Sequence, residues 1–408
     1  MNFRFIHAAD LHLDTPLTGL QRRNPALGRQ LQDASLEAFD AIIERAIARR
    51  VLFVVFAGDL YDGIERGARA QRRFLMGLRK LAEAGIEVFI AHGNHDPEGG
   101  RWERIPSWPA GVHVFPSGEP TTVQVTRDGQ VVAHVLGVSY GQRREFDNLA
   151  RRFPISNERG FHLGVLHCNV DGDPDHDPYA PCSIGELFSK RYDYWALGHI
   201  HTHSVRRDGA RYVVYPGSTQ GRNFNRFELG PKGAVEVTVD DDRVQAVEHF
   251  PTDRVRFLDL PIYAQGLDDG RLLEVMISEA RRAAADHPGR PLVVRGRIRG
   301  TTSAHRILRQ ASEREELLAD LASAAPEGVY WAALQDETRA PLDLDALAAG
   351  DDLRAALVGA QRAWAADGIP DGLKAELARA GLTLDTDALR ALSAGALDDL
   401  LGALERAQ

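Results

Sequence analysis

Short continuous runs of apolar residues alternate with stretches of helical spacing near the start of the chain. The apolar runs are residues 3–9, 51–57 and 86–91. Each is typical of a strand that is buried on both faces. The stretches with helical spacing are residues 31–50 and 69–84, and Gly85 follows the second at a position where helices favour glycine. This β-α-β-α-β order predicts a layered α/β domain.

More strands are predicted in the following part of the chain. They cover residues 121–126, 131–138, 161–166, 194–197, 212–215, 234–239 and 244–250. Asp128 and Gly129 separate the first two of these strands and predict a tight hairpin turn. The last two strands are also expected to form a hairpin, which closes the domain.

The pattern changes near Pro251. Strands are predicted over residues 255–260, 291–298 and 329–334, and helices over residues 272–285 and 303–322. This is the pattern of a small α+β domain. The Ala-, Leu- and Asp-rich remainder predicts short helices over residues 353–365, 372–380 and 386–405. We therefore expect a first domain over residues 1–253, an α+β domain over 254–340 and a helical region over 341–408.

The composition is that of a soluble globular protein. The 408 residues are 44% hydrophobic and 26% charged, and the length suggests two or three domains. No apolar run approaches the roughly 18 residues of a membrane span, and the first residues lead into a strand instead of a secretory signal. The two cysteines, Cys168 and Cys182, form no disulfide framework. We expect a cytoplasmic protein that has no contact with membranes.

The net charge of −9 excludes a globally basic nucleic-acid binder. Residues 341–408 hold 12 acids and 6 bases, so the helical region carries much of the negative charge. The rest of the chain is nearly balanced and can still contain a local basic groove. Charge therefore neither requires nor excludes DNA as a partner.

Side chains able to bind metals follow several of the predicted strands. They are Asp10, His12, Asp59, Asp62, Asn94, His95, Asp96, His167, His199 and His201. Loops at the carboxyl ends of strands converge on ligands in open α/β sheets. Each segment alone is weak evidence, because Gly-Asp and Asn-rich segments are usually turns. Their common placement after strands predicts a metal site, and mixed carboxylate, amide and imidazole ligands suit Mn²⁺ or Fe²⁺, with Zn²⁺ an alternative.

The ordered motifs Asp10-x-His12, Gly58-Asp59-x-x-Asp62, Gly93-Asn94-His95-Asp96, His167 and Gly198-His199-x-His201 resemble those of the calcineurin-like metallophosphoesterases. A narrower resemblance is to the SbcD and YhaO branch of DNA repair exonucleases. It rests on the segment 193–201, on Tyr215-Pro216-Gly217-Ser218, on Gln220-Gly221-Arg222 and on the segment 230–234. The segments 166–170 and 179–182 are most similar to the YhaO-like group.

The resemblance implies a fold and a ligand set. The fold is a four-layer α/β/β/α sandwich, followed by a small α+β capping domain and a helical tail. One of two divalent cations, Mn²⁺ by preference, would be bound by Asp10, His12 and His201. The other would be bound by Asn94, His167 and His199, and Asp59 would bridge the two. His95 would act as a general acid toward the leaving oxygen or as a hydrogen-bond donor to the phosphate, and Asp96 would orient it.

The resemblance also implies a function. We expect a two-metal phosphodiesterase that hydrolyses DNA as an exonuclease, works with an SMC-like ATPase of the SbcC/YhaN type and forms a homodimer. The acidic C-terminal helices could dock that ATPase, or they could simply complete the fold. A cyclic-nucleotide or small-molecule phosphodiesterase and a phosphoprotein phosphatase share the same ligands and remain alternatives. A partner-binding protein with a decayed site is disfavoured, because every proposed ligand is present.

Several other residues have expected places. His7 and His92 lie in strand runs and are expected in the core, His203 at the exposed rim, and Cys168 as a packed thiol. The arginines in or near loops are Arg22, Arg23, Arg66, Arg69, Arg143, Arg144, Arg222 and Arg226. Most are expected on the solvated surface, with Arg222 nearest the site. Asn223 and Arg226 stand where the family pattern has a histidine and a later glutamate, so this loop departs from the family.

Overall fold

The computed structural model describes residues 2–13, 15, 25–62, 68–98, 107–157 and 159–379. Arg22, Arg23, Arg66 and the helix expected over residues 386–405 lie outside these ranges. The chain divides into two compact units. One comprises residues 1–260, 279–295 and 322–333, and the other comprises residues 261–278, 296–321 and 334–408. Within the described ranges, every helix is too short or too polar to span a bilayer.

The first sheet has six strands in the order β12-β11-β1-β2-β3-β4. They are β1 (Phe3–Ala8), β2 (Phe53–Ala57), β3 (Glu87–Ala91), β4 (Val112–Val114), β11 (Gly233–Asp240) and β12 (Arg243–Pro251). β1 to β4 are parallel, and β11 pairs antiparallel with β1 and with β12. The three apolar runs near the start of the chain thus form the parallel centre of the sheet, as predicted.

The second sheet also has six strands, in the order β5-β6-β7-β8-β10-β9. They are β5 (Thr121–Arg127), β6 (Gln130–Gly137), β7 (Phe161–His167), β8 (Tyr194–Gly198), β9 (Ser204–Asp208) and β10 (Arg211–Tyr215). β6, β7, β8 and β10 are parallel. Asp128 and Gly129 turn the β5–β6 hairpin with positive φ angles of 53° and 77°, which is the predicted tight turn.

The two sheets pack face to face around an aromatic core. Phe5 of β1 stacks on Phe53 of β2 with ring centroids 4.9 Å apart, and it meets the edge of Tyr194 from the second sheet at 5.1 Å. Leu163 and Val135 complete this buried layer from the second sheet. Strands buried on both faces therefore read as continuous apolar runs in the sequence.

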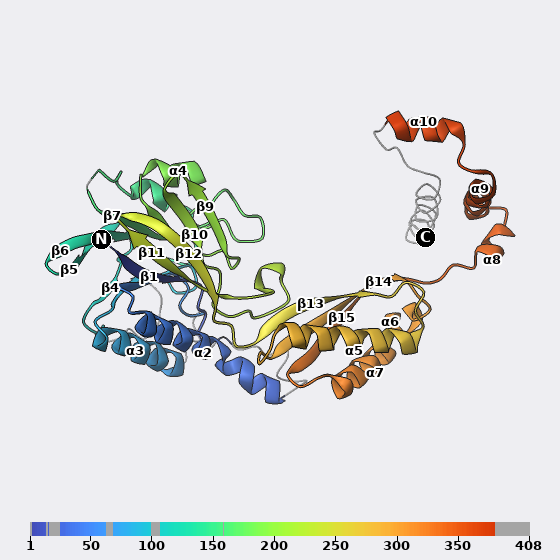
Figure 1. The fold of residues 1–408 in the computed structure, drawn as a ribbon, viewed down its shortest axis with the longest axis horizontal. Helices are drawn as coiled ribbons and strands as arrows, with labels where there is room; N and C mark the ends of the chain where they lie inside the picture. The colour runs from blue at the N-terminus through green and yellow to red at the C-terminus, as the bar shows by residue number, and fades with distance from the viewer. Residues whose placement is uncertain are drawn as a thin grey trace. The chain divides into compact units, whose positions relative to one another are not determined.

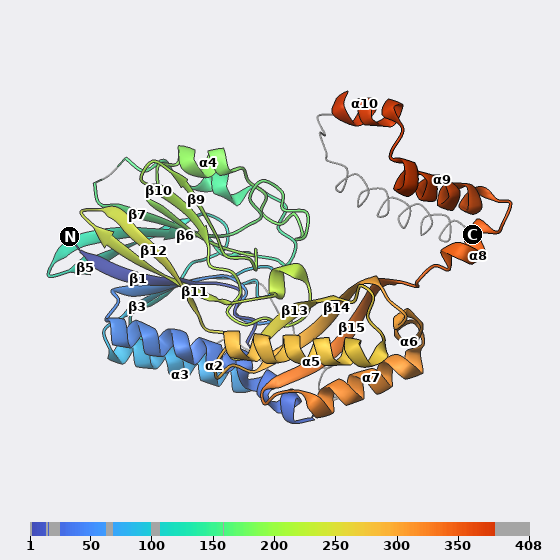
Figure 2. The ribbon, with the colours of Figure 1, turned by 45° about the vertical axis from the view of Figure 1, so that its right-hand side comes forward.

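Helices cover the outer faces of both sheets. α2 (Pro25–Arg49) and α3 (Ala68–Glu83) lie along the first sheet, where Phe39 and Phe74 contact Phe56 (Figures 1 and 2). The 3-10 helix η1 (Leu149–Arg152) and α4 (Ile184–Ser189) cover the second sheet. There the Trp195 indole N–H donates to the Leu187 carbonyl at 3.1 Å. These layers confirm the four-layer α/β/β/α prediction.

A third sheet of three strands, in the order β13-β14-β15, follows along the chain. It comprises β13 (Arg256–Tyr263), β14 (Leu292–Thr301) and β15 (Val329–Arg339), with α5 (Asp269–Asp286), α6 (His305–Arg309) and α7 (Ala311–Ala324) in the same stretch. The single helix predicted over residues 303–322 is instead two helices, because Gln310 adopts an extended conformation between them. The helices α8 (Leu344–Ala348), α9 (Leu353–Asp367) and α10 (Asp371–Arg379) follow.

Candidate metal centre

The polar side chains singled out in the sequence follow the carboxyl ends of β1, β2, β3, β7 and β8. Strands of both sheets end at this point, and a direct hydrogen bond joins them. The His199 amide, after β8, donates to both carboxylate oxygens of Asp10, after β1, at 3.0 and 3.1 Å. The loops after β1 and β2 also pair, because the His12 amide donates to the Asp59 carbonyl at 3.0 Å. The predicted convergence at one edge is therefore present.

Two glycines of the motifs allow this close approach. A Cβ atom on Gly198 would lie 1.9 Å from the Ala57 carbonyl oxygen, which is an impossible contact. Gly58 has a φ of +93°, and a Cβ atom there would lie 2.2 Å from Nδ1 of His167. The Gly-Asp and Gly-His motifs thus have a steric cause as well as a chemical one.

The backbone at the centre is unusual for residues with a side chain. Asp10, His12, Asp59 and His199 all have positive φ angles, of 51°, 42°, 52° and 98°. Such conformations cost on the order of 1 kcal/mol or more and persist where surrounding structure enforces them, often at functional sites. Here each sharp turn directs a carboxylate or imidazole toward the same point beyond a strand end.

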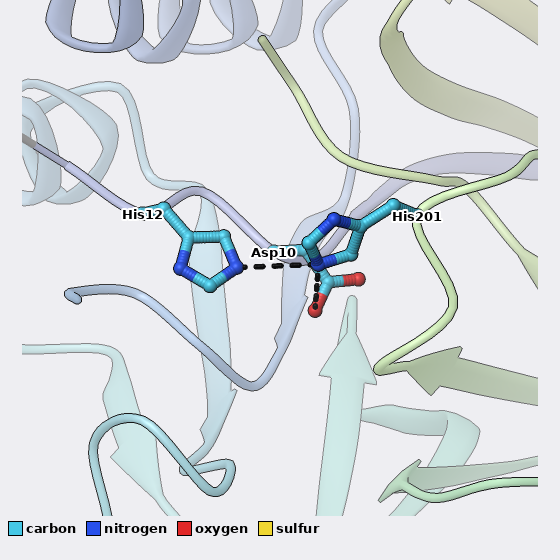
Figure 3. Close-up of side chains that lie close together, drawn as sticks. All are labelled: Asp10, His12 and His201. Atoms are coloured by element: carbon cyan, nitrogen blue, oxygen red, sulfur yellow. Dashed lines mark hydrogen bonds and ion pairs between the residues drawn. The ribbon is translucent and has the colours of Figure 1, made fainter. Parts of the chain in front are cut away.

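Asp10, His12 and His201 form the first group of potential ligands (Figure 3). His12 Nε2 lies 3.3 Å from His201 Nε2, and His201 Nε2 lies 3.9 Å from Asp10 Oδ1. All three residues are buried, and His12 Nδ1 has no hydrogen-bond partner within the described part of the chain. One potential ligand atom from each residue lies within 4.8 Å of the others.

The second group is Asp10, Asp59 and His167. His167 Nε2 lies 3.4 Å from Asp59 Oδ2 and 3.0 Å from the side-chain oxygen of Asn94. Its other nitrogen, Nδ1, donates to the Ala57 carbonyl at 2.9 Å. The carbonyl therefore holds the ring so that Nε2 faces the centre. Asn94, Asp59 and His167 are thus together, as the resemblance implied, with Asp10 beside them.

Glu228 is a buried acid beside the candidate centre that the sequence reasoning missed. Its carboxylate is fully buried in the 3-10 helix η2 (Arg226–Glu228), and Oε1 lies 3.0 Å from His201 Nδ1 and 3.3 Å from Arg222. Burial raises the pKa of Glu228, but the hydrogen bond and charge of His201 outweigh it and lower the pKa to about 2. The ionised carboxylate therefore accepts a hydrogen bond from Nδ1–H, which keeps the proton of the neutral ring on Nδ1 and leaves a lone pair on His201 Nε2. Glu228 lies two residues beyond Arg226, in the loop for which the sequence predicted no role.

His95 is paired with Asp62, whereas Asp96 is occupied elsewhere. His95 Nδ1 lies 2.6 Å from Asp62 Oδ1, and Arg222 contacts the other oxygen of Asp62 at 3.2 Å. Asp96 was expected to orient His95. Its two oxygens instead accept the amides of Leu60 and Gly93, at 2.9 and 2.8 Å, so Asp96 fixes the turn after β3. The structure thus gives Asp62 the position at the His95 ring.

His199 has the opposite ring arrangement. Its Nε2 donates to the Asp177 carbonyl at 2.8 Å, which leaves Nδ1 as the nitrogen without a proton in the neutral ring. His199 is absent from the compact carboxylate–imidazole groups found among the described residues, although its ring lies 5.2 Å from that of His167. Two of the nine residues expected in the centre therefore differ from the expected arrangement. His199 lies outside the compact groups, and Asp96 contacts backbone amides.

His176 is a second residue beside the centre that belongs to none of the motifs in the sequence. Its side chain is 9% exposed, and its ring lies 5.7 Å from the rings of both His199 and His201. Nδ1 lies 3.3 Å from Asp173, and Nε2 is buried with no hydrogen-bond partner in the described chain. His176 sits in an acidic segment that reads as a solvated loop, so no periodicity or spacing could have found it.

The electrostatics of the centre favour a cation. Burial raises the pKa of Asp10 and, together with the charge of Arg222, lowers that of His12. Burial acts against the charges of Asp59 and His167, but their mutual attraction outweighs it. This attraction lowers the pKa of Asp59 and raises the pKa of His167 to about 9. His167 thus serves as counter-ion to Asp59, a role that a divalent cation would take over with release of the proton.

The remaining expectations are met in part. Arg222 is adjacent to the site, as expected. His7 and His92 are buried, and His7 contacts the Tyr194 hydroxyl at 3.0 Å. His203 is half-buried instead of exposed, because its Nδ1 donates to the Tyr215 carbonyl at 2.9 Å. Cys168 is buried, with its sulfur 3.9 Å from that of Cys182 and no disulfide between them.

The donor set fits divalent cations. It combines two buried carboxylates, an amide oxygen and four imidazoles. The second ring nitrogens of His167, His199 and His201 contact protein oxygens, as is typical of metal-ligating histidines. The Nε2 atoms of His12 and His201 lie 3.3 Å apart and are hydrogen-bonded when one ring donates its proton, and both would become lone pairs for a shared cation once that proton is released. Five of the ligands proposed from the sequence, Asp10, His12, Asp59, His167 and His201, thus lie in groups that could hold a metal ion. His12 also forms a third such group with Asp62 and His95.

Comparison with known families agrees with this geometry. Residues 3–203 match the calcineurin-like phosphoesterase family, and residues 257–339 match the middle domain of metallophosphoesterase YhaO. The chain therefore carries a calcineurin-like metallophosphoesterase domain with its dimetal core, followed by a YhaO middle domain. It is homologous to the YhaO, Mre11 and SbcD proteins.

Three relatives illustrate this homology. The uncharacterized metallophosphoesterase YhaO of Bacillus subtilis is 38% identical over 239 residues, 58% of either chain. The DNA double-strand break repair protein Mre11 of Aeropyrum pernix is 29% identical over 231 residues, 52% of this chain and 53% of that one. The SbcD component of the nuclease SbcCD of Bacillus subtilis is 23% identical, over 54% of this chain and 63% of that one. Each match thus covers less than two thirds of the relative.

Proposed function

We propose that the protein is a DNA exonuclease that hydrolyses phosphodiester bonds with two divalent cations. The observation that carries the proposal is the pair of ligand groups that share Asp10, with Asp59 between His12 and His167. The names of two relatives, a double-strand break repair protein and a nuclease component, support DNA as the substrate. The catalytic domain would be residues 1–253, followed by a capping domain over 254–340 and a helical region over 341–408.

The proposed ligands are those that the family resemblance implies; they include all of the first group and Asp59 and His167 of the second. Asp10, His12 and His201 would hold one cation, and Asn94, His167 and His199 the other, with Asp59 bridging. His199 would bind through Nδ1, because the Asp177 carbonyl occupies Nε2. When bound, the two cations would activate a water and offset the charge of the phosphate. Hard oxygen donors beside imidazoles suit Mn²⁺, with Fe²⁺ and Zn²⁺ as the other metals to be compared.

His95 is the proposed general acid. Its side chain is 39% exposed, whereas those of His12, His167 and His201 are at most 9% exposed, so substrate can reach it. Burial lowers the pKa of His95, but the charges of Asp59 and Asp62 and the hydrogen bond to Asp62 outweigh it and raise the pKa. The Asp62 carboxylate accepts a hydrogen bond from Nδ1–H of His95. This contact orients Nε2–H so that it can protonate the leaving oxygen. General acid catalysis of this kind contributes about 10²–10⁴-fold in rate.

Partners are proposed from the same relatives. One relative is named as a single component of the nuclease SbcCD, which supports assembly with a second protein. We propose that this second protein is an SMC-like ATPase of the SbcC/YhaN type. The helices of the acidic region after residue 341, among them α9, are the proposed docking segment. We further propose a homodimer in the cytoplasm.

The test is a nuclease assay with purified full chain and added Mn²⁺. The substrates are end-labelled single- and double-stranded DNA, bis-p-nitrophenyl phosphate and a cyclic nucleotide, and His95→Ala is the inactive control. We expect shortening of DNA that His95→Ala abolishes. Hydrolysis of the small diesters alone, also with an SMC-like ATPase added, would contradict DNA as substrate. Hydrolysis of none of them would contradict the phosphodiesterase itself.

A further inference from the structure

A loop at the edge of the metal centre exposes an aromatic side chain. The loop, residues 141–147, is here called the rim loop, and it connects β6 with η1. Its Phe146 is 60% exposed to solvent. Because β6 runs parallel to β7 and β8, the rim loop leaves the sheet at the same edge as His167 and His199. Ligands of open α/β sheets bind at the carboxyl ends of the strands, so an exposed ring at this edge is well placed to contact a substrate.

The rim loop begins and ends against the metal centre. Tyr140, directly before it, is buried and places its ring edge 5.5 Å from the ring of His167. At the other end, the ring of Phe146 lies 5.6 Å from that of Tyr179, and Tyr179 lies 6.0 Å from His199. Tyr179 therefore connects the ring of Phe146 to His199, a proposed metal ligand. At this distance Phe146 could contact a DNA strand bound at the cations.

Hydrogen bonds fix the loop in this position. The Glu145 carbonyl accepts the Ala180 amide at 2.7 Å, which ties the rim loop to the segment that carries Tyr179. Beyond the loop, Glu186 accepts from Asn148 at 2.9 Å and from Arg151 at 2.9 Å. Phe146 is thus held in place, and its exposure is a feature of the anchored fold.

Two arginines near Phe146 can contact an anionic ligand. Arg143 and Arg144 precede it and are both exposed. Of the two acids that flank Phe146, Asp147 pairs with Arg152 at 3.0 Å, and the half-buried Glu145 accepts the Asp147 amide at 3.0 Å. An exposed aromatic ring beside two arginines is the combination by which proteins bind single-stranded nucleic acids, with bases on the ring and phosphates on the cations.

We infer that the rim loop is a binding site for the DNA strand that enters the metal centre. Phe146, backed by Tyr179, stacks on a nucleobase, and Arg143 and Arg144 contact the neighbouring phosphates. The inference rests on the proposed function and extends it, because it predicts that an unpaired, splayed strand is recognised at the site. A base in a duplex cannot stack on a protein ring without leaving its neighbours.

The test is oligonucleotide binding measured by fluorescence anisotropy. The full chain carries His95→Ala so that the DNA stays intact, and Mn²⁺ is present throughout. Phe146→Ala should weaken binding of single-stranded DNA by about 5- to 100-fold, and Phe146→Trp should restore it. Ile155→Ala is the matched control, because it removes another exposed apolar side chain, 52% exposed and outside the rim loop, and should change nothing.

A modified substrate isolates the stacking contact. Oligonucleotides with one abasic site at successive positions from the end are bound to the His95→Ala protein, with Phe146 intact and with Phe146→Ala added. At the stacked position, Phe146→Ala should cause no further loss. Replacing Arg143 and Arg144 by alanine should weaken binding to all sequences and reduce the salt dependence by about one charge each.

The outcomes separate the rim loop from the nuclease activity. Equal affinity of Phe146→Ala and Ile155→Ala for single-stranded DNA would overturn the inference and favour a protein partner at Phe146. A loss in Phe146→Ala that is the same at every abasic position would overturn it too, because it would indicate a general distortion. Cleavage is measured separately with His95 intact. Binding in the predicted pattern without any cleavage would support the rim loop and contradict only the nuclease.

Discussion

Replacement of Glu228 by glutamine should weaken metal binding without removing a ligand. The buried carboxylate accepts the Nδ1 proton of His201 at 3.0 Å and thereby fixes Nε2 as a lone pair. Glutamine keeps the size and one acceptor oxygen but loses the charge. A hydrogen bond to a charged group contributes about 1.5–3 kcal/mol and a neutral one about 1 kcal/mol. The difference of about 0.5–2 kcal/mol corresponds to roughly 2- to 30-fold in affinity for the cation held by His201.

The assay is a Mn²⁺ titration of bis-p-nitrophenyl phosphate hydrolysis, with Mn²⁺ binding measured in parallel by calorimetry. The apparent dissociation constant should rise, and most of the rate should return at saturating Mn²⁺. Glu236→Gln is the matched control. Glu236 is also a buried glutamate paired with arginines, at 2.8 Å from both Arg45 and Arg49, but it supports the first sheet away from the ligands. Unchanged Mn²⁺ affinity in Glu228→Gln, or an equal loss in Glu236→Gln, would refute the reasoning.

Three further predictions follow from single contacts. Asp62→Asn removes the charged partner of His95 and should lower kcat about tenfold or more with little change in KM, as measured by steady-state kinetics; a pure KM effect would contradict it. Gly198→Ala places a Cβ atom 1.9 Å from the Ala57 carbonyl and should cost about 3 kcal/mol or more of stability, measured by urea unfolding; a wild-type midpoint would argue against the close approach. Burial raises the pKa of Asp193 to about 6, so the folded state binds the extra proton and loses stability as pH rises from about 4 to 6. Asp193→Asn should therefore match the wild type near pH 4 and exceed it by about 1–2 kcal/mol at pH 8, after allowance for partial exposure; an equal difference at both pH values would contradict this.

The sequence predicted the parts of the fold that depend on local pattern. Buried parallel strands are continuous apolar runs, so β1, β2 and β3 were evident. The ligands directly after those strands were evident for the same reason, because a strand end defines where its next side chains lie. The helix over residues 303–322 was predicted as one element because apolar spacing does not register an extended conformation at Gln310.

The parts that were missed depend on contacts between distant segments. Asp96 follows His95 within one motif and Asp62 belongs to an earlier motif, and only the tertiary arrangement decides which one meets the His95 ring. Glu228 lies 27 residues after its partner His201, in a short 3-10 helix without periodicity. His176 and Phe146 lie in loops, where side-chain placement follows from anchoring hydrogen bonds that no spacing predicts.

The most direct test of the central claim is a titration of metal-free protein with Mn²⁺ while hydrolysis of end-labelled DNA is followed. Bound metal is counted by mass spectrometry in the same samples. We predict no cleavage in chelator and a rate that reaches its plateau at two equivalents of Mn²⁺ per chain, with Asp59→Asn unable to reach it. Full activity in chelator, or a plateau at one equivalent, would contradict a two-metal phosphodiesterase at this site.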